Sequence, residues 1–424
     1  MTDADSDGAE PADAAETEAI PLLSPADGVP ALSVTPSEIR AAAELLASGH
    51  GPFAVDAERA SGFRYSNRAY LLQIRRDGAG TVLIDPVNHA ADPLTTLAPV
   101  AEVLATDEWV LHAADQDLPC LAEIGMRPTK LYDTELAGRL AGYDRVNLAT
   151  MVERLLGLGL KKGHGAADWS KRPLPPEWLN YAALDVEVLI ELRAAIVAVL
   201  EEQGKSDWAA EEFEYLRTFV GTPTRRDRWR RTSGIHKIRD RRAMAAVREL
   251  WATRDHIARR RDIAPGRILP DSAIINAATA DPKNVDELTA LPVFGGSRQR
   301  RTAQVWLDAL SRARDGDDPP EISEPQNGPP PASRWARRKP EAAARLEAAR
   351  AGLTELSERV SVPTENLLTP EVVRRLCWDW QPADDTESAV DDFLRDALAR
   401  PWQRRLVVPI LAAALDGSAQ AAPE

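Results

Sequence analysis

The sequence PFAVDAE at residues 52–58 is a short apolar run that ends in two acids. Its length and its Phe and Val content predict a β-strand. Side chains alternate between the two faces of a strand, so we expect Asp56 and Glu58 on the same face. Two neighbouring carboxylates repel each other unless a cation lies between them. The alternative is a solvated strand end, because acid-x-acid pairs arise by chance among 66 Asp and Glu residues.

A second acidic element follows the expected strand Trp109–His112. Asp117 stands at the start of an expected helix that reaches Ile124. Capping of this helix is the alternative role for an acid here, and Asp115 is the nearer candidate for the cap. Spacing alone does not decide which of the two acids belongs to a site. His112, at the strand end, is typical of a core histidine or of one that supports a site.

The third acidic element is Tyr181-Ala-Ala-Leu-Asp185. It lies on a helix expected to begin near Pro176 and to reach about Glu202. Residues four apart share a helix face, so the Tyr181 phenol and the Asp185 carboxylate are expected side by side. The two alanines after Tyr181 would let the helix approach a sheet or a substrate closely. Amphipathic helices often contain Tyr and Asp, so this element also has an ordinary structural interpretation.

The segments between these elements predict a mixed α/β sheet. Tyr70–Arg75 and Thr81–Asp85 are expected strands, and Asp77-Gly78 supplies the turn between them. Together with the first strand they predict an antiparallel meander. Helix and strand then alternate, beginning with an expected helix over Leu94–Leu104, and this mixture favours a mixed sheet. Val34–Ser48 is expected to be the helix that precedes the sheet.

The net charge of −14 is unevenly distributed along the chain. Residues 1–32 contain many acids and neither Lys nor Arg, which predicts a disordered acidic tail. A strongly basic block opposes it and contains Arg225, Arg226, Arg228, Arg230, Arg231, Lys237, Arg239, Arg241 and Arg242. The acidic total therefore does not exclude a polyanionic partner.

Other features of the composition indicate a cytoplasmic protein. Cys120 and Cys377 are too few and too far apart for a disulfide framework or a zinc site, which fits a reducing compartment. No apolar run approaches the roughly 18 residues needed to span a bilayer. The longest, Leu406–Leu415, is broken by Pro409 and predicts a buried helix. The N-terminus lacks the basic start and apolar core of a signal peptide.

At 424 residues the chain is too long for one ordinary core. Beyond about residue 220 the pattern predicts helices alone, in two parts separated by a Pro-rich linker. A repeat is indicated because Ile263-Ala-Pro-Gly-Arg-Ile-Leu269 is echoed by Ser361-Val-Pro-Thr-Glu-Asn-Leu367. The expected division is a tail over 1–32, an α/β domain over 33–220, a basic segment with a helical domain over 221–314, a linker over 315–333 and a last helical domain over 334–418.

Read together, the acidic elements resemble the DEDD exonuclease superfamily, in its Tyr-type branch, and most closely ribonuclease D. The resemblance covers most of residues 50–195 and depends on an ordered set of motifs. Besides the three elements, the set contains Leu72-Gln-Ile74, Ile84-Asp-Pro86, His112-Ala113, Tyr132-Asp-Thr134, Asn147-Leu148, Asp168-Trp169 and Arg172-Pro-Leu174. The resemblance places the acid of the second element at Asp117 and not at Asp115.

This resemblance implies a ribonuclease H-like core that hydrolyses phosphodiesters from the 3′ end and releases nucleoside 5′-monophosphates. Asp56, Glu58 and Asp185 would bind one metal ion. Asp56 would bridge to a second ion, whose waters Asp117 would hold, and Tyr181 would orient the attacking water. Two ions about 4 Å apart would activate that water and stabilise the leaving 3′ oxygen. Ligands that are all oxygen favour Mg²⁺ or Mn²⁺ over zinc.

The segment from about Ile235 to Leu310 resembles the helicase-and-RNase-D C-terminal (HRDC) domain, through Trp251-Ala-Thr-Arg-Asp255 and Ile263-Ala-Pro265. The resemblance implies that this domain holds RNA. A group of arginines just before it would neutralise phosphates with little sequence preference: Arg225, Arg226, Arg228, Arg230 and Arg231. The alternative is a solvated, charged helix face. The last helical domain resembles HRDC domains more weakly. A scaffolding role fits it at least as well as RNA binding does.

We therefore expect a ribonuclease H-like α/β exonuclease domain with a mixed sheet, followed by two all-α HRDC-like domains. The expected function is that of a metal-dependent 3′→5′ exoribonuclease acting on RNA with a free 3′ end, such as transfer RNA precursors or other structured RNA. A 3′→5′ exodeoxyribonuclease is the first alternative, because proofreading exonucleases share the same five residues. A non-catalytic RNA-binding scaffold and an adaptor that docks proteins through the linker and the tail are the others.

Overall fold

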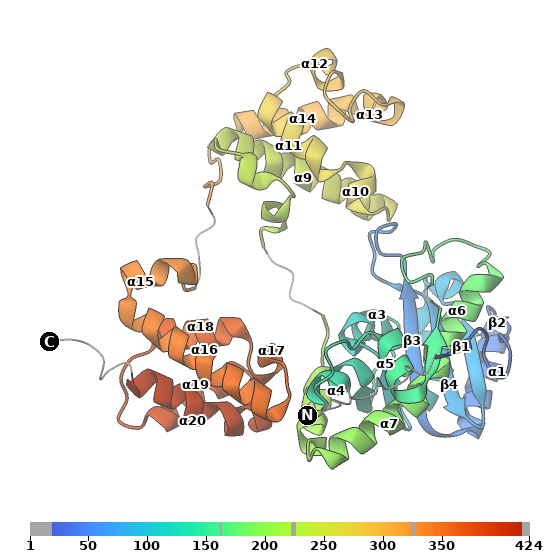
Figure 1. The fold of residues 1–424 in the computed structure, drawn as a ribbon. Coiled ribbons are helices and arrows are strands. Elements are labelled where there is room, and N and C mark those ends of the chain that lie inside the picture. Colours follow the sequence, from blue (N-terminus) through green and yellow to red (C-terminus); the bar gives the residue numbers. More distant parts are fainter. Residues whose placement is uncertain (1–18, 162, 222–225, 324–327, 418–424) are drawn as a thin grey trace, which may run out of the picture.

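The computed structural model describes residues 19–161, 163–221, 226–323 and 328–417. It consists of an α/β domain, a first helical domain and a last helical domain (Figure 1). The expected succession of a mixed sheet and two all-helical domains is thereby confirmed. None of the described helices is long and apolar enough to cross a membrane.

A six-stranded mixed sheet forms the centre of the α/β domain, in the order β2-β5-β4-β3-β6-β7. Its strands are β2 (Leu32–Ser33), β3 (His50–Arg59), β4 (Ala69–Asp77), β5 (Gly80–Ile84), β6 (Glu108–Leu111) and β7 (Lys130–Asp133). The expected antiparallel meander is β3-β4-β5. Strand β6 runs parallel to both β3 and β7, so the carboxyl ends of these three strands meet at one edge of the sheet.

Helices cover both faces of this sheet. On one face, α1 (Pro36–Ser48) and α2 (Pro93–Leu104) bury Ile39, Leu46 and Leu97 against the strands. On the other face lie α6 (Pro176–Glu187) and α7 (Leu189–Glu202), which contact β3. We expected one helix here, but the chain breaks it at Val188, whose N–H donates to Val186 O instead of continuing the helical ladder.

The expected disordered tail over 1–32 is wrong for its described part. Residues 1–18 lie outside the described residues, but β1 (Ile20–Leu22) pairs in parallel with β8 (Leu158–Leu160). Leu22 and both ends of β8 pack against the large core cluster of the domain. The apolar run at residues 20–23 therefore belongs to the folded domain, although the acids around it dominate the composition.

The two helical domains repeat one local pattern. In the first, the 21-residue helix α9 (Arg241–Arg261) is followed by α10 (Pro265–Ile268) and α11 (Asp271–Ala280). In the last, α16 (Pro340–Val360), α17 (Thr364–Leu367) and α18 (Pro370–Asp379) have the same order and lengths. Each long helix ends at a residue in the left-handed region, with φ of 48° at Asp262 and 50° at Ser361.

Further helices complete both bundles. The first helical domain adds α12 (Val285–Thr289), α13 (Ser297–Arg301) and α14 (Ala303–Asp315), and the last adds α15 (Trp335–Arg338), α19 (Thr386–Asp396) and α20 (Pro401–Gly417). The α/β domain also contains α3 (Leu118–Glu123), α4 (Thr134–Leu140), α5 (Leu148–Leu156) and α8 (Ser206–Arg217). Leu411 and Leu415 are buried within α20, as the sequence predicted for this helix.

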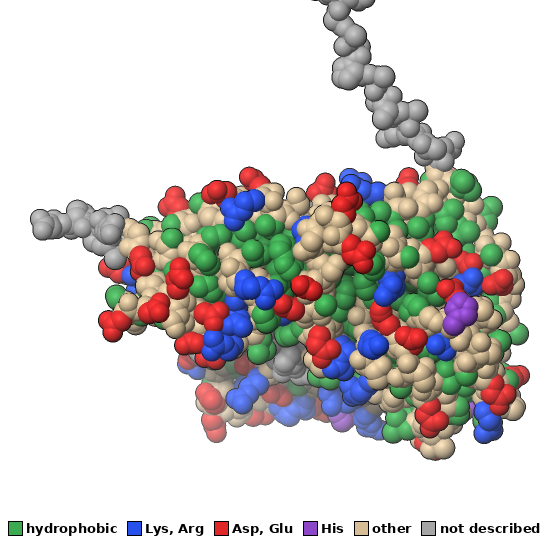
Figure 2. Space-filling model, turned by 90° about the horizontal axis from the view of Figure 1, so that it is seen from below, with side chains coloured by type: hydrophobic (Ala, Val, Ile, Leu, Met, Phe, Trp, Pro, Cys, Tyr) green, Lys and Arg blue, Asp and Glu red, His purple; other side chains and the backbone are tan. Residues whose placement is uncertain are grey.

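Both helical domains contact the α/β domain. The backbone N–H of Ala264 donates to Phe63 O at 3.0 Å, and the Tyr65 hydroxyl donates to the Asp255 carboxylate at 3.1 Å. In the last helical domain, the Trp402 ring stacks on Trp208 of α8 with centroids 4.9 Å apart. On the face in Figure 2, acidic and basic side chains are interspersed, so the net charge of −14 does not make that face uniformly acidic.

Candidate active site

Three carboxylates converge at the carboxyl edge of β3. Oxygen atoms of Asp56, Glu58 and Asp185 all lie within 4.8 Å of one another. Asp56 and Glu58 come from β3, and Asp185 comes from α6, which packs across that strand. The approach is close because Ala182 and Ala183 of α6 are fully buried against the sheet. The resemblance to the DEDD exonucleases implied this grouping of the three carboxylates.

Asp117 joins the same cavity from the loop after β6, and only 4% of its surface is exposed. Its side chain makes no capping hydrogen bond to α3, so helix capping does not explain its burial. Asp115 is exposed and does not line the cavity. The structure thus separates the two acids that spacing alone left undecided.

A buried acid behind the cavity fixes the loop that carries Asp117. Asp133, at the end of β7, accepts hydrogen bonds from the backbone N–H groups of Ala113 at 3.1 Å and Ala114 at 2.7 Å. Beside this loop, His112 Nδ1 lies 2.9 Å from Thr134 Oγ1, and burial lowers the pKa of His112 to about 4. His112 is therefore neutral near pH 7 and supports the loop, as its place at the strand end indicated.

Burial and mutual repulsion raise the pKa values of the clustered acids. The pKa of Glu58 rises to about 10, chiefly because it is buried and then because of the charges of Asp56 and Asp185. Burial likewise raises the pKa of Asp117 well above its usual range, and the charge of Asp56 adds to this. Asp117 Oδ1 accepts no hydrogen bond from the described residues, although it forms an ion pair with Arg59 Nη2 at 3.3 Å. An all-oxygen cluster that repels itself in this way fits hard divalent cations.

Tyr181 lines the same cavity, one helical turn before Asp185. Burial, followed by the charge of Asp185, raises the pKa of its phenol well above the usual range. The ring meets His164 edge-on, with centroids 5.8 Å apart, and lies 6.4 Å from the Trp169 ring. Tyr181 is therefore a fixed, protonated hydroxyl beside the acids.

The cavity has a volume of about 400 Å³ and contains residues that the sequence did not single out. Arg59 directly follows the first acidic element, and Lys161 and Gly163 come from the loop between β8 and α6. Gln73, which entered only as part of a family motif, donates from Nε2 to Asp56 Oδ2 at 3.1 Å. Arg59 could have been suspected from the sequence, because it directly follows the first acidic element. The position of Gly163 at the cavity depends on the tertiary fold, and no local pattern indicates it.

The arginines proposed to bind RNA lie apart from this cavity, before the first helical domain. Arg225 lies outside the described residues, and Arg226, Arg228 and Arg231 are exposed. Arg230 differs from them, because its Nη1 donates to the carbonyl of Glu321 in the linker at 3.0 Å.

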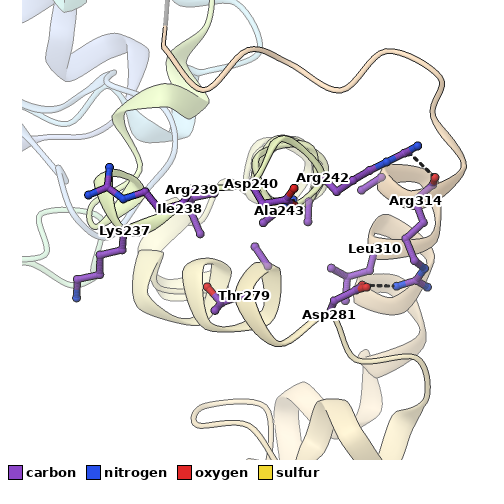
Figure 3. Close-up of a pocket in the computed structure, with 13 residues that line it drawn as sticks. Lys237, Ile238, Arg239, Asp240, Arg242, Ala243, Thr279, Asp281, Leu310 and Arg314 are labelled. Atoms are coloured by element: carbon purple, nitrogen blue, oxygen red, sulfur yellow. Dashed lines mark hydrogen bonds and ion pairs between the residues drawn. The ribbon is translucent and has the colours of Figure 1, made fainter.

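A second cavity lies between α9, α11 and α14, with basic residues along its rim. Figure 3 shows that Arg242 points away from this cavity to the Arg314 carbonyl, 2.8 Å from its Nη1. Arg314 in turn pairs with Asp281 at 2.8 Å. The basic block is therefore partly engaged within the chain, and only some of its members are free to meet a polyanion.

Comparisons with known proteins agree with this architecture. The sequence matches the 3′-5′ exonuclease family over residues 33–201, the HRDC domain over residues 243–310 and the 3′ to 5′ exonuclease C-terminal domain over residues 328–415. It is 30% identical to the ribonuclease D of Acidiphilium cryptum over 358 residues, which is 81% of this chain and 87% of that protein. The ribonuclease D of Nitrobacter hamburgensis is 29% identical over 337 residues, 77% of this chain and 80% of that protein.

Two solved structures extend the comparison to the whole fold. A protein from Bifidobacterium adolescentis has a TM-score of 0.84 and 37% identity, covering 94% of this chain and all of that one. Escherichia coli RNase D, described as an exoribonuclease involved in structured RNA processing, has a TM-score of 0.65 and 24% identity, covering 93% of this chain and 99% of that one. The latter likeness concerns the fold alone.

Proposed function

Since this chain belongs to the ribonuclease D family, we propose that it is a 3′→5′ exoribonuclease that releases nucleoside 5′-monophosphates. The observation that carries the proposal is the convergence of the Asp56, Glu58 and Asp185 oxygens within 4.8 Å of one another. Asp117 and Tyr181 line the same cavity. Such a cluster suits phosphoryl transfer, in which catalysis depends on positioning and on charge stabilisation.

The donor set supports two divalent cations, Mg²⁺ or Mn²⁺, because every ligand it offers is an oxygen. Asp56, Glu58 and Asp185 would hold one ion, and Asp56 would also hold the other, whose waters Asp117 would bind. When bound, the ions supply positive charge that stabilises the attacking and leaving oxygens. The four carboxylates supply the negative charge that binds these cations. Water solvates Glu58 and Asp117 poorly because both are buried.

Tyr181 positions the attacking water in this proposal. The raised pKa of the phenol keeps its hydroxyl protonated at neutral pH, so it can donate a hydrogen bond to a water as well as accept one. Its place one turn before Asp185 on a rigid helix holds that water next to the acids. The packing of Trp169 and His164 on the ring restricts the phenol to one orientation.

We further propose that the helical domains select the RNA. The exonuclease domain would comprise residues 33–220 with residues 19–32 folded onto it, and the arginines at 225–231 would bind phosphates. The exposure of Arg226, Arg228 and Arg231 supports this, because such side chains can neutralise a backbone without reading its sequence. Transfer RNA precursors or other structured RNA in the cytoplasm are the substrates we propose.

The test uses matched RNA and DNA oligonucleotides, each labelled at the 5′ end, with Mg²⁺, with Mn²⁺ and with EDTA. We expect stepwise shortening of RNA from the 3′ end, release of 5′-mononucleotides, and no reaction in EDTA. DNA cleavage as fast as RNA cleavage would favour the exodeoxyribonuclease instead. An Asp56→Asn protein that still degraded RNA would place the active site elsewhere.

A further inference from the structure

Arg59, the last residue of β3, lines the candidate active site. Strict alternation along β3 would place Arg59 on the face opposite Glu58. The pairing with β4 slips at this point, since Glu58 pairs with Leu71 but Arg59 pairs with Ala69, which leaves Tyr70 as an extra residue. The extra residue belongs to β4, and the irregularity coincides with the end of β3. At this strand end, Arg59 lines the cavity together with the acids Asp56, Glu58 and Asp117.

The guanidinium has more donors than its protein partners use. Its Nη2 lies 3.3 Å from Asp117 Oδ1 and 3.5 Å from Gln116 Oε1. Its Nε is buried and has no hydrogen-bond partner among the described residues. An arginine carries five N–H donors in a rigid plane, and leaving a buried donor unpaired is costly. The side chain is still 23% exposed, so a ligand in the cavity can reach it.

We propose that Arg59 is a substrate-positioning residue that binds the phosphate oxygens of the RNA at its 3′ end. This inference rests on the proposed function of the site. A planar guanidinium matches two oxygens of a phosphate, which a lysine ammonium does not. The other cationic side chain among the described residues lining this cavity is Lys161, which is exposed.

The alternative is that Arg59 serves only as a counter-ion that holds Asp117. The two roles predict opposite effects of substitution on metal binding. If Arg59 binds phosphate, its removal leaves Mn²⁺ affinity unchanged or tighter, because a positive charge that competes for Asp117 is lost. If it only orients Asp117, its removal weakens Mn²⁺ binding and leaves the contribution of the RNA phosphate intact.

The experiment compares Arg59→Gln and Arg59→Lys with the wild-type full-length protein. Arg40→Gln is the control, since Arg40 is exposed on α1, on the opposite face of the sheet. Binding of single-stranded RNA is measured by fluorescence anisotropy in Ca²⁺ at one fixed salt concentration. A second RNA series carries one neutral methylphosphonate at each of its last three linkages. Mn²⁺ binding is measured by calorimetry, and folding by thermal unfolding.

We expect Arg59→Gln to weaken RNA binding roughly ten-fold or more, as for loss of a charge-assisted hydrogen bond, with Arg59→Lys in between. A methylphosphonate at the contacted linkage should weaken the wild type by a similar factor and Arg59→Gln hardly at all. Additive losses at every linkage, or unchanged RNA binding with weaker Mn²⁺ binding, would overturn the proposal. Absence of RNA hydrolysis by the wild type would refute the proposed function separately, because these binding measurements need no turnover.

Discussion

Gly163 lies directly against the ring of Tyr181. A Cβ atom placed on Gly163 would lie 2.3 Å from Cδ2 of Tyr181, closer than any real side-chain contact. At Gly165 the corresponding distance to the Tyr181 hydroxyl is 3.5 Å, which is ordinary contact. The loop between β8 and α6 thus fixes the phenol by packing backbone against it, and the lack of a side chain at Gly163 is what permits the contact.

Gly163→Ala should therefore lower kcat, because the added methyl group displaces either the loop or the phenol. A misplacement of about 1 Å at a reacting group can cost on the order of a hundred-fold in rate. Gly165→Ala is the matched control and should retain nearly full activity. Single-turnover rates on a short RNA report the chemical step, and binding of the same RNA is measured separately, so an effect on catalysis is distinguished from an effect on RNA binding. Equal losses in both variants would contradict a specific role of Gly163.

Gln73 is the partner of Asp56 in the sheet register and is fully buried. Because it donates to Asp56 Oδ2, Gln73→Leu should leave that carboxylate without its donor and free to rotate. Hydrogen-bond partners of metal ligands typically contribute about 10- to 100-fold in metal affinity or activity. We expect a loss of Mn²⁺ affinity in that range, measured by calorimetry. Unchanged affinity in a stably folded variant would show that the hydrogen bond does not orient Asp56.

Metal binding should release protons near neutral pH. Burial raises the pKa of Glu58 to about 10, so this acid is protonated at pH 7 without metal, and a metal ligand must be deprotonated. Metal affinity should therefore increase with pH, by up to about ten-fold per pH unit for each proton released. Calorimetry in buffers of different ionisation enthalpy counts those protons. Affinity independent of pH between 6 and about 8 would contradict this expectation.

The burial of Glu58 and its repulsion by neighbouring acids should also make the metal-free protein less stable as pH rises. The folded pKa of Glu58, about 10, lies above its ordinary value of 4.5, so between these values the folded state holds a proton that the unfolded chain has lost. The free energy of unfolding then falls as pH increases through this window. Glu58→Gln should reduce that slope and stabilise the metal-free protein at pH 8 by on the order of 1 kcal/mol or more. Urea unfolding in EDTA at two pH values measures it, and a less stable variant at pH 8 would refute it.

Local patterns predicted the elements that carry the acids. The run at residues 52–58 lies within β3, and the spacing of Tyr181 and Asp185 places both on α6. These predictions depend on alternation and on helical period, which a short window of sequence contains. The same reasoning misplaced residues 19–32, because the few apolar residues at 20–23 find their partner in β8, more than a hundred residues away.

The remaining parts of the candidate site depend on contacts between distant segments. Arg59 ends β3, and alternation along that strand does not indicate that its guanidinium lies beside Asp117. Gly163 and Tyr181 meet because a loop folds back onto α6. Asp115 and Asp117 were undecided by spacing because both can begin a helix, and only the packed structure shows which one is buried. Sequence patterns thus indicated which acids were candidates, while the surroundings that tune them required the fold.

Lys205 joins the last helical domain to the α/β domain, and this contact gives a final prediction. Its Nζ is buried and donates to Leu140 O at 2.7 Å and to Ser361 O at 3.3 Å, at the ends of α4 and α16. Lys205→Met would leave two carbonyls without a donor, at a cost of about 1–3 kcal/mol. Amide hydrogen exchange in α17 should therefore become faster, whereas exchange in β3 should not change.

The matched control for this substitution is Arg405→Met. Arg405 also bridges the two domains, through an ion pair with Glu211 at 3.0 Å, but its side chain is 58% exposed. Exposed pairs contribute at most about 1 kcal/mol, so this variant should exchange like the wild type. Equal acceleration of exchange in both variants would mean that the interface depends on its net charge. No acceleration in either variant would mean that the stacked rings of Trp208 and Trp402 hold the domain without Lys205. Either result would contradict a specific role for Lys205.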